Sequence, residues 1–204
     1  MTLMVWLIIQ NLIPLNELIL LNSISLPQLI EAHREFSDTF KAYWHQNVFL
    51  TPRWWFLIML SILPAIIWWI LVNKKRIIEI TAFGLFYGVA AIILDSIGSN
   101  ALAWTYPYIL SPYLRPQLYP YDVGVVIISF MFCYQLWSNS FKKFFLFSGL
   151  LAAFLAFVAE PIMVWLGFYK AIYWKHIYSF PIYWLLGIIC WGIITYFKKL
   201  EQER

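Results

Sequence analysis

The sequence predicts an all-α membrane protein: a polytopic bundle of five transmembrane helices that follows an N-terminal amphipathic segment. Of the 204 residues, 63% are hydrophobic and only 12% are charged, which is too apolar for a soluble domain of this size. The hydrophobic residues gather in stretches of about 18–22, the length at which a helix crosses a bilayer. Basic residues lie in short clusters between these stretches, which is typical of membrane topology signals rather than of a nucleic-acid-binding surface.

The N-terminal segment, residues 1–50, is expected to lie at the membrane surface. Residues 1–21 are apolar, but Gln10, Asn11 and Pro14 interrupt the run. An interfacial helix is therefore favoured over a sixth span. Residues 26–44 repeat large hydrophobic side chains at helical spacing, which predicts an amphipathic helix on the outer surface.

The membrane domain comprises residues 51–199, and a tail of residues 200–204 follows it. Its hydrophobic stretches are residues 54–72, 77–98, 121–137, 144–166 and 180–197. Eight basic residues lie at one end of these stretches: Lys74, Lys75, Arg76, Lys142, Lys143, Lys198, Lys199 and Arg204. The other end carries Arg53, Arg115, Lys170 and Lys175. Because positively charged loops stay in the cytoplasm, the C-terminus is expected to be cytoplasmic and the 99–120 and 167–179 loops to face outward.

Three carboxylates fall at what should be the same end of three different stretches: Asp95, Asp122 and Glu160. An acid near the centre of a membrane helix costs roughly 2.5–3.5 kcal/mol. Three acids at one depth therefore indicate either a mutually satisfied structure or a site. A fourth acid, Glu79, lies near the cytoplasmic end, where an i,i+4 ion pair with Lys75 explains it.

Two of these acids end a stripe of small residues on one helical face. The stripes, both with the spacing i, i+4, i+7 and i+11, are Gly84, Gly88, Ala91 and Asp95, and Gly149, Ala153, Ala156 and Glu160. Small residues at this spacing let a second helix approach closely, so Asp95 and Glu160 are predicted to face the inside of the bundle. Asp122 follows Pro120 and either complements a helix dipole or lies at the rim of the same pocket.

Residues of the outer loops complete the candidate pocket. They are Trp104, Tyr106, Trp174, Lys175 and His176. Lys175 and His176 either neutralise the acids and pass protons to them or reach outward to water. The proline-rich 105–121 loop is stiff, and it serves either as a connector among the lipid head groups or as a lid over a cavity.

The sequence lacks the P-loop, GxGxxG, HExxH, GxSxG and CxxC motifs. Nucleotide-binding, zinc-protease and serine-hydrolase functions therefore have no support. Cys133 and Cys190 lie inside apolar stretches and are interpreted as packing residues. Neither a metal nor a cofactor is expected.

Several strings together resemble an uncharacterised family of small multi-spanning proteins from spore-forming Gram-positive bacteria. They are Leu94-Asp95-Ser96-Ile97-Gly98, Trp104-Thr105-Tyr106-Pro107, Pro120-Tyr121-Asp122, Phe157-Val158-Ala159-Glu160-Pro161, Trp165-Leu166-Gly167 and Trp174-Lys175-His176-Ile177-Tyr178-Ser179-Phe180-Pro181. The resemblance covers residues 52–197. It implies a location in the bacterial inner membrane and no established activity.

A fainter similarity links Asp95, the Trp104-x-Tyr106 string and the Pro120-x-Asp122 string to bacterial-type lycopene cyclase membrane domains. The similarity implies protonation of a polyene by membrane carboxylates. Where that family has paired acids after the proline, this chain has Asp122 alone, between Tyr121 and Val123.

The sequence leaves three functions open. The favoured one is a non-enzymatic membrane protein whose polar outer pocket binds a hydrophobic or prenyl ligand, or serves assembly of the envelope. The second is an enzyme that modifies a prenyl or polyene lipid by acid catalysis with Asp95, Asp122 and Glu160. The third is a small proton or cation transporter, against which stand the lack of charge at mid-depth and of an inverted repeat. Membrane lipids are the expected partners, and the oligomeric state is not specified.

Overall fold

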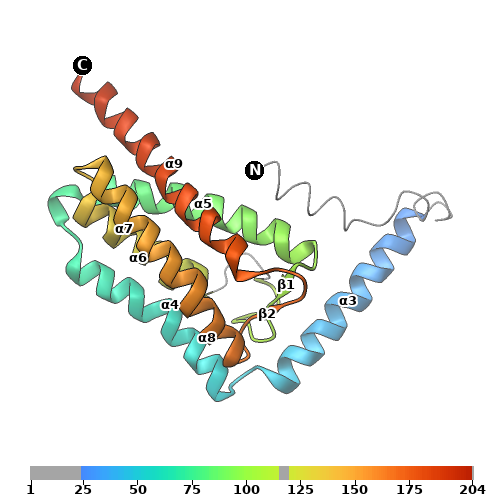
Figure 1. Cartoon of the computed structure of the whole chain (residues 1–204). Coiled ribbons are helices and arrows are strands. Elements are labelled where there is room, and N and C mark those ends of the chain that lie inside the picture. Colours follow the sequence, from blue (N-terminus) through green and yellow to red (C-terminus); the bar gives the residue numbers. More distant parts are fainter. Residues whose placement is uncertain (1–23, 115–119, 204) are drawn as a thin grey trace.

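The computed structural model describes residues 24–114 and 120–203, and this part of the chain is helical apart from loops and two short strands (Figure 1). The α-helices are α3 (Leu26–Asn47), α4 (Pro52–Leu71), α5 (Ile77–Asn100), α6 (Ile127–Trp137), α7 (Phe141–Phe154), α8 (Glu160–Trp165) and α9 (His176–Gln202). Three further segments are the 3-10 helix η1 (Lys74–Arg76) and the π-helices η2 (Tyr121–Val126) and η3 (Leu155–Ala159). The strands are β1 (Trp104–Thr105) and β2 (Lys170–Ala171). The predicted all-α fold is confirmed.

Four helical segments are long and apolar enough to cross a membrane: Pro52–Leu71, Lys74–Asn100, Phe141–Trp165 and His176–Gln202. The shortest has 20 residues, which matches the roughly 20 that span a bilayer. The chain is therefore a multi-pass membrane protein. The remaining expected span, η2 with α6, is apolar but shorter (Tyr121–Trp137), so the fifth span stays a prediction.

Helices α5, α6, α7 and α9 pack in a ring, and α4 lies outside it against η2 (Figure 1). Aromatic side chains fill the centre of the ring. Phe83 stacks on Tyr134 with ring centroids 4.4 Å apart, and Tyr87 stacks on Phe130 at 4.5 Å. All four are buried, and each such pair contributes about 0.5–1.5 kcal/mol beyond the area it buries. This core holds together the helices that carry the acids.

The first stripe of small residues lies against α6. A Cβ atom added to Gly84 would lie 2.5 Å from the Met131 sulfur, and one added to Gly88 would lie 2.8 Å from Ile127. Asp95, two turns beyond Gly88, is buried. Close contact at the two glycines therefore sets the distance between α5 and α6.

The second stripe does not form one buried face, because η3 interrupts it. The backbone N–H of Glu160 donates to the carbonyl of Leu155, five residues back, and the extra residue rotates the helix that follows. Gly149 and Ala153 are consequently half-buried, with Gly149 against Trp184 of α9. The buried face runs instead through Phe144, Ser148, Ala152, Leu155, Ala156 and Glu160.

The other π-helix, η2, carries Asp122. The Ile127 N–H donates to the Asp122 carbonyl, again over five residues. Gly124 touches α4 so closely that an added Cβ would lie 2.2 Å from the Leu60 carbonyl oxygen. That carbonyl receives no i+4 helical hydrogen bond, since Pro64 has no N–H. Both π-helices lie beside a candidate site acid, where such segments are frequently found.

Helix α3 stands at an angle to the ring (Figure 1). It begins with Pro27 in its first turn, and of its 22 residues only Trp44 is buried. Trp44 Nε1 donates to the Ile109 carbonyl at 2.9 Å. A position of α3 on the membrane surface remains a prediction. Residues 1–21, the expected interfacial helix or sixth span, lie outside the described residues.

Glu79 has partners other than the predicted one. Arg76 reaches both Glu79 oxygens at 3.0 Å, and Lys198 Nζ lies 3.0 Å from Oε1. The Tyr134 hydroxyl donates to the same oxygen at 2.7 Å. The predicted ion pair with Lys75 is wrong, because η1 leaves Lys75 exposed and turns Arg76 toward Glu79. Helix α9 also continues to Gln202, so the expected tail is largely helical.

Candidate functional site

Two loops meet at one end of the ring and close it. β1 pairs antiparallel with β2, with Trp104 opposite Ala171 and Thr105 opposite Lys170. The Ala103 carbonyl also accepts from the N–H groups of three successive residues after β2, at 3.0 to 3.3 Å. These hydrogen bonds join the loop after α5 to the loop after α8.

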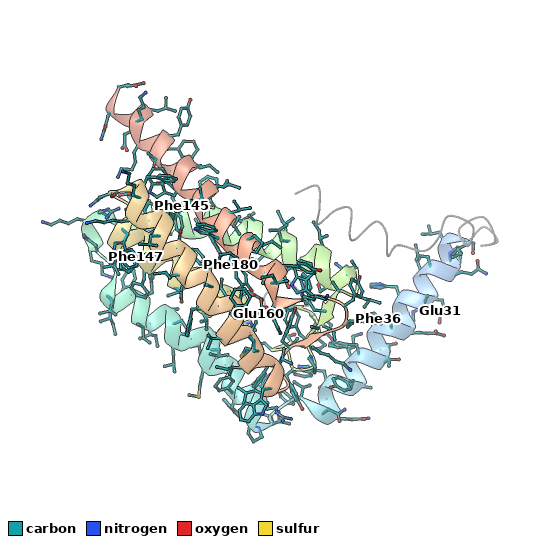
Figure 2. All side chains as sticks on the ribbon, viewed as in Figure 1. Glu31, Phe36, Phe145, Phe147, Glu160 and Phe180 are labelled. Carbon is teal, nitrogen blue, oxygen red and sulfur yellow. The ribbon has the colours of Figure 1, made fainter. Side chains whose placement is uncertain are left out.

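Beneath these loops lies a cavity of about 70 Å³, measured as the space open to the centres of water molecules. Its lining residues are Ala91, Leu94, Asp95, Trp104, Tyr106, Asp122, Val126, Glu160, Tyr169, Trp174, Ser179, Ile182, Tyr183 and Leu186. One water needs roughly 10–15 Å³ on this measure, so several fit. Six of the eight pocket residues proposed from the sequence line the cavity, three of them acids. Figure 2 shows Glu160 within the bundle.

Asp95 is held by donors from the loop after α5. Trp104 Nε1 donates to Asp95 Oδ1 at 2.9 Å, and the Tyr106 hydroxyl donates to the same oxygen at 2.5 Å. Gly98 makes room for the Trp104 ring, since a Cβ at this position would lie 1.9 Å from a ring carbon. The partners are buried, so bulk water competes little for these hydrogen bonds. The loop therefore fixes the orientation of this carboxylate.

Glu160 has the most hydrogen-bond donors of the three cavity acids. His176 Nδ1 lies 2.8 Å from Oε2, Ser179 Oγ donates to Oε2 at 3.0 Å, and the Tyr183 hydroxyl donates to Oε1 at 2.7 Å. The three donors lie at i, i+3 and i+7 of α9, one face of the helix. Trp174 Nε1 in turn donates to Ser179 Oγ at 2.9 Å. If Glu160 is ionised, its carboxylate only accepts, and His176 then donates from Nδ1.

Asp122 is the least satisfied acid. Among the described residues, its side chain has one hydrogen-bond partner, the Tyr106 hydroxyl, 3.4 Å from Oδ2. A phenol has one hydrogen, and the shorter distance assigns it to Asp95. A hydrogen bond at Asp122 then requires Asp122 to carry a proton and donate it. Burial is the largest cause that raises the pKa of Tyr106 well above its ordinary value, so the phenol keeps its own hydrogen. Asp122 is thus the acid most open to a ligand.

Of the predicted Lys–His pair, only His176 reaches a cavity acid. Helix α9 begins at His176 rather than near Phe180, which puts His176 in its first turn and against Glu160. Lys175 precedes the helix, and its side chain is exposed. The prediction that Lys175 belongs to the pocket is wrong, because the start of the helix leaves it outside the cavity lining.

A smaller hollow of about 20 Å³ adjoins the same acids. Its lining residues are Tyr106, Tyr121, Asp122, Glu160, Met163, Tyr169 and Tyr183. The Tyr121 hydroxyl is buried and has no hydrogen-bond partner in the described part of the chain. Leaving such a group unpaired costs about 1–3 kcal/mol, so a bound molecule that pairs with it gains affinity.

Three polar lining residues lie outside the set proposed from the sequence: Tyr169, Ser179 and Tyr183. Ser179 and Tyr183 share a helix face with His176. Helical spacing would have identified them from the sequence only if the helix had been predicted to begin at residue 176. Tyr169 lies in the loop after α8, with its ring centroid 5.7 Å from that of Tyr106. The position of Tyr169 follows from the pairing of two loops, and hydrophobic periodicity in the sequence does not predict such a pairing.

An apolar groove on the outside of the bundle lies next to the cavity. It lies between α5 and α9 and is lined by Ala82, Leu85, Phe86, Val89, Ala90, Ile93, Leu186, Ile189, Cys190 and Ile193. Its volume is about 470 Å³ on the same measure. Leu186 lines both the groove and the cavity. The Leu186 side chain therefore lies between the groove and the cavity.

No protein-family model, no curated protein and no solved structure matches this chain. The site is therefore interpreted from its own geometry. In residues 24–114 and 120–203, no three His, Cys, Asp or Glu side chains are grouped so that they could hold a metal ion. The three acids line a cavity instead of converging on one point.

Proposed function

We propose that this chain is a five-span protein of the bacterial inner membrane that binds an amphipathic, lipid-like ligand. The polar end of the ligand enters the acidic cavity, and its hydrocarbon chain lies in the groove between α5 and α9. One observation carries the proposal: an apolar groove on two membrane-crossing helices and a cavity lined by three acids lie next to each other and share the lining residue Leu186.

A hydrocarbon chain suits the groove because of where the groove lies. Leu85, Val89 and Ile189 are more than half exposed, and in a membrane they face acyl chains. The cavity offers far less space than the groove, about 70 Å³ against 470 Å³. It accommodates a head group but not a long chain, so the two ends of an amphipathic molecule match the two compartments.

Photo-crosslinking tests this proposal. A benzophenone amino acid is placed at Ile189 in the groove or, as a control, at Leu150 on α7; both positions are 57% exposed. In membranes, the Ile189 variant should form adducts enriched in one lipid class, whereas the Leu150 variant should sample the bulk lipid. The same lipid mixture at both positions would remove the groove as a specific site.

Five spans with a cytoplasmic C-terminus place the cavity on the extracytoplasmic side. The 17 residues of Tyr121–Trp137 reach the lower limit, about 17 residues, for a transmembrane helix. Packing of α6 between α5 and α7 supports a full crossing. The C-terminal end of α9 and the connection between α4 and α5 lie at the end opposite to β1 and β2 (Figure 1). These segments carry Lys198 and Arg76, which agrees with the positive-inside rule.

Cysteine labelling tests this topology. Tyr113 and Asn139 are exposed and flank the η2–α6 segment, while the native Cys133 and Cys190 are buried. A membrane-impermeant maleimide should label Tyr113→Cys in intact cells and Asn139→Cys only after permeabilisation. Labelling of both in intact cells would contradict the fifth span.

A second candidate function, acid catalysis on a prenyl or polyene lipid, is favoured by the contact of Tyr106 with two acids. If Asp122 holds a proton against Tyr106, it is a carboxylic acid beside an aromatic-lined cavity, where it can protonate a double bond. Aromatic ring faces would stabilise the resulting cation. In vesicles supplied with a polyprenyl lipid, the wild type should form a product and Asp122→Asn should not. Unchanged substrate with the wild type would eliminate this candidate.

A further inference from the structure

We propose that the polar end of the ligand is a primary ammonium group, R–NH3⁺, carried by a membrane lipid. This inference rests on the proposed function and adds the chemical class of the head group. Three features of the cavity point to it: its charge, its aromatic wall and its unfilled hydrogen-bond acceptors.

Three acids, Asp95, Asp122 and Glu160, line the cavity, and no Lys or Arg is among the described residues that do so. Within residues 24–114 and 120–203, the one basic side chain in contact with these acids is His176, against Glu160. A positively charged ligand relieves the repulsion between the acids, whereas an anionic one adds to it. The charge of the cavity therefore favours a cation.

Four aromatic rings form a continuous wall on the loop side of the cavity. The Trp104 ring centroid lies 4.8 Å from that of Trp174 and 6.5 Å from that of Tyr169, which lies 5.7 Å from that of Tyr106. The rings are inclined to one another by 42° to 67°, so none of these pairs is stacked face to face. A ring face attracts a cation that lies within about 6 Å of its centroid. The wall thus suits an organic cation.

Unfilled acceptors select a primary ammonium over a quaternary one. Among the described residues, Asp122 has only its 3.4 Å contact with Tyr106, and the Tyr121 hydroxyl is buried without a partner. Both line the hollow of about 20 Å³, which suits a group the size of one water molecule. A primary ammonium has three N–H donors for these oxygens, whereas a quaternary ammonium has none.

The head group is tested with probes that share one chain. The full chain in detergent is titrated with decylammonium, decyltrimethylammonium and decanol, and the dissociation constants are compared. Decylammonium should bind at least about tenfold more tightly than either of the others, because only it brings charge-assisted N–H donors. Equal binding of the quaternary probe or of decanol would overturn the ammonium assignment.

Two variants locate the effect. Asp122→Asn should remove most of the preference for decylammonium, and Tyr121→Phe should reduce it by a smaller factor. The control Asp38→Asn removes an exposed carboxylate on α3, paired with Lys41, and should leave binding unchanged. Thermal unfolding of each variant shows whether it is folded. A preference that is unchanged from the wild type in folded Asp122→Asn or in folded Tyr121→Phe contradicts the assignment to that residue.

The source of the ammonium is tested separately. In nanodiscs of mixed phospholipids, lipid retained by the protein should be enriched in ethanolamine head groups over choline head groups, and free ethylammonium should bind far more weakly than decylammonium. Equally tight ethylammonium binding would indicate a free amine in place of a lipid.

If all decyl probes bind equally while Ile189 adducts stay enriched, only the head group is wrong. If no decyl probe binds and Ile189 adducts match those of Leu150, the proposed function fails as well.

Discussion

The two ends of the bundle bury acids in different ways. At one end, Glu79 has two cations, Arg76 and Lys198, within 3.0 Å. At the other end, Asp95 receives its hydrogen bonds from the neutral Trp104 and Tyr106. A cation balances the charge of a buried carboxylate, whereas a neutral donor supplies hydrogen bonds and leaves the charge. The charge of Glu79 is therefore compensated within the protein, whereas the charge of Asp95 still favours a positively charged ligand.

Membrane topology explains why the ends differ. The positive-inside rule concentrates Lys and Arg at the end proposed to be cytoplasmic, so an acid buried there finds a counter-charge nearby. An acid at the opposite end lacks this supply. The outer cavity uses Trp, Tyr and Ser donors and one histidine instead. Four substitutions test this contrast.

The largest effect is expected for Glu79→Gln. It leaves Arg76 and Lys198 without their carboxylate in a partly buried position. We expect a loss of about 2–3 kcal/mol of unfolding free energy, somewhat less than for a fully buried pair, measured by denaturant unfolding in detergent. The control Glu203→Gln breaks an exposed pair with Lys199 and should change stability by less than about 0.5 kcal/mol. Equal effects would show that the end with Glu79 is not charge-balanced as described.

Gly98→Ala should have the next largest effect, at the outer end. The new methyl group would overlap the Trp104 ring, and overpacking of this kind costs about 1–3 kcal/mol. The control Gly192→Ala adds a methyl group to α9 with nothing within 4 Å, so it should be neutral or slightly stabilising. Thermal unfolding of the two variants compares them directly. Equal stability of both would mean that Trp104 does not pack on Gly98.

Ser179→Ala should be milder. It removes a hydrogen bond to Glu160 and leaves the Trp174 N–H without its acceptor, a loss of about 1 kcal/mol. Ser148 is buried as well, but it bonds only to Phe145 of its own helix, so Ser148→Ala should cost less. The difference in unfolding free energy between the two variants is the measurement. A larger loss for Ser148→Ala would contradict the role of Ser179 in holding Glu160.

Asp122→Asn should have the smallest effect on stability. Within the described residues, Asp122 takes part in one long contact, with Tyr106, so its unfolding free energy should stay within about 0.5 kcal/mol of the wild type. Most of the preference for decylammonium over the other decyl probes should nevertheless be lost. A destabilisation as large as that of Glu79→Gln would show that Asp122 stabilises the fold, and the two ends of the bundle would then not differ as described.

Patterns along the chain predicted part of the site. The stripe of Gly84 and Gly88 correctly predicted that Asp95 faces the inside of the bundle, because α5 is a regular helix in which the spacing of residues is constant. The second stripe also predicted the burial of Glu160, but Gly149 and Ala153 lie off the buried face, because η3 adds a residue to the turn before Glu160. Helical spacing assumes 3.6 residues per turn, so it carries no information about a π-helix.

Lys175 and His176 show that sequence patterns also do not give the exact start of a helix. The hydrophobic stretch predicts a helix start near Phe180, yet α9 begins four residues earlier, at His176. His176 enters the helix and contacts Glu160, whereas Lys175 stays exposed. Polar residues can extend a helix when tertiary contacts supply hydrogen bonds to their side chains, and hydrophobicity alone does not predict where such a helix begins.

By itself, the sequence determined the class of protein, its apolar helices and the ends at which basic residues and acids collect. These properties depend on the composition of each segment, because hydrophobicity and charge partition residues between water and lipid locally. Only the tertiary structure decided that Glu79 is balanced by Arg76 and Lys198, and that Asp122 keeps oxygens open to a ligand. Those outcomes depend on distances of a few ångströms between segments far apart in the chain, which local patterns do not specify.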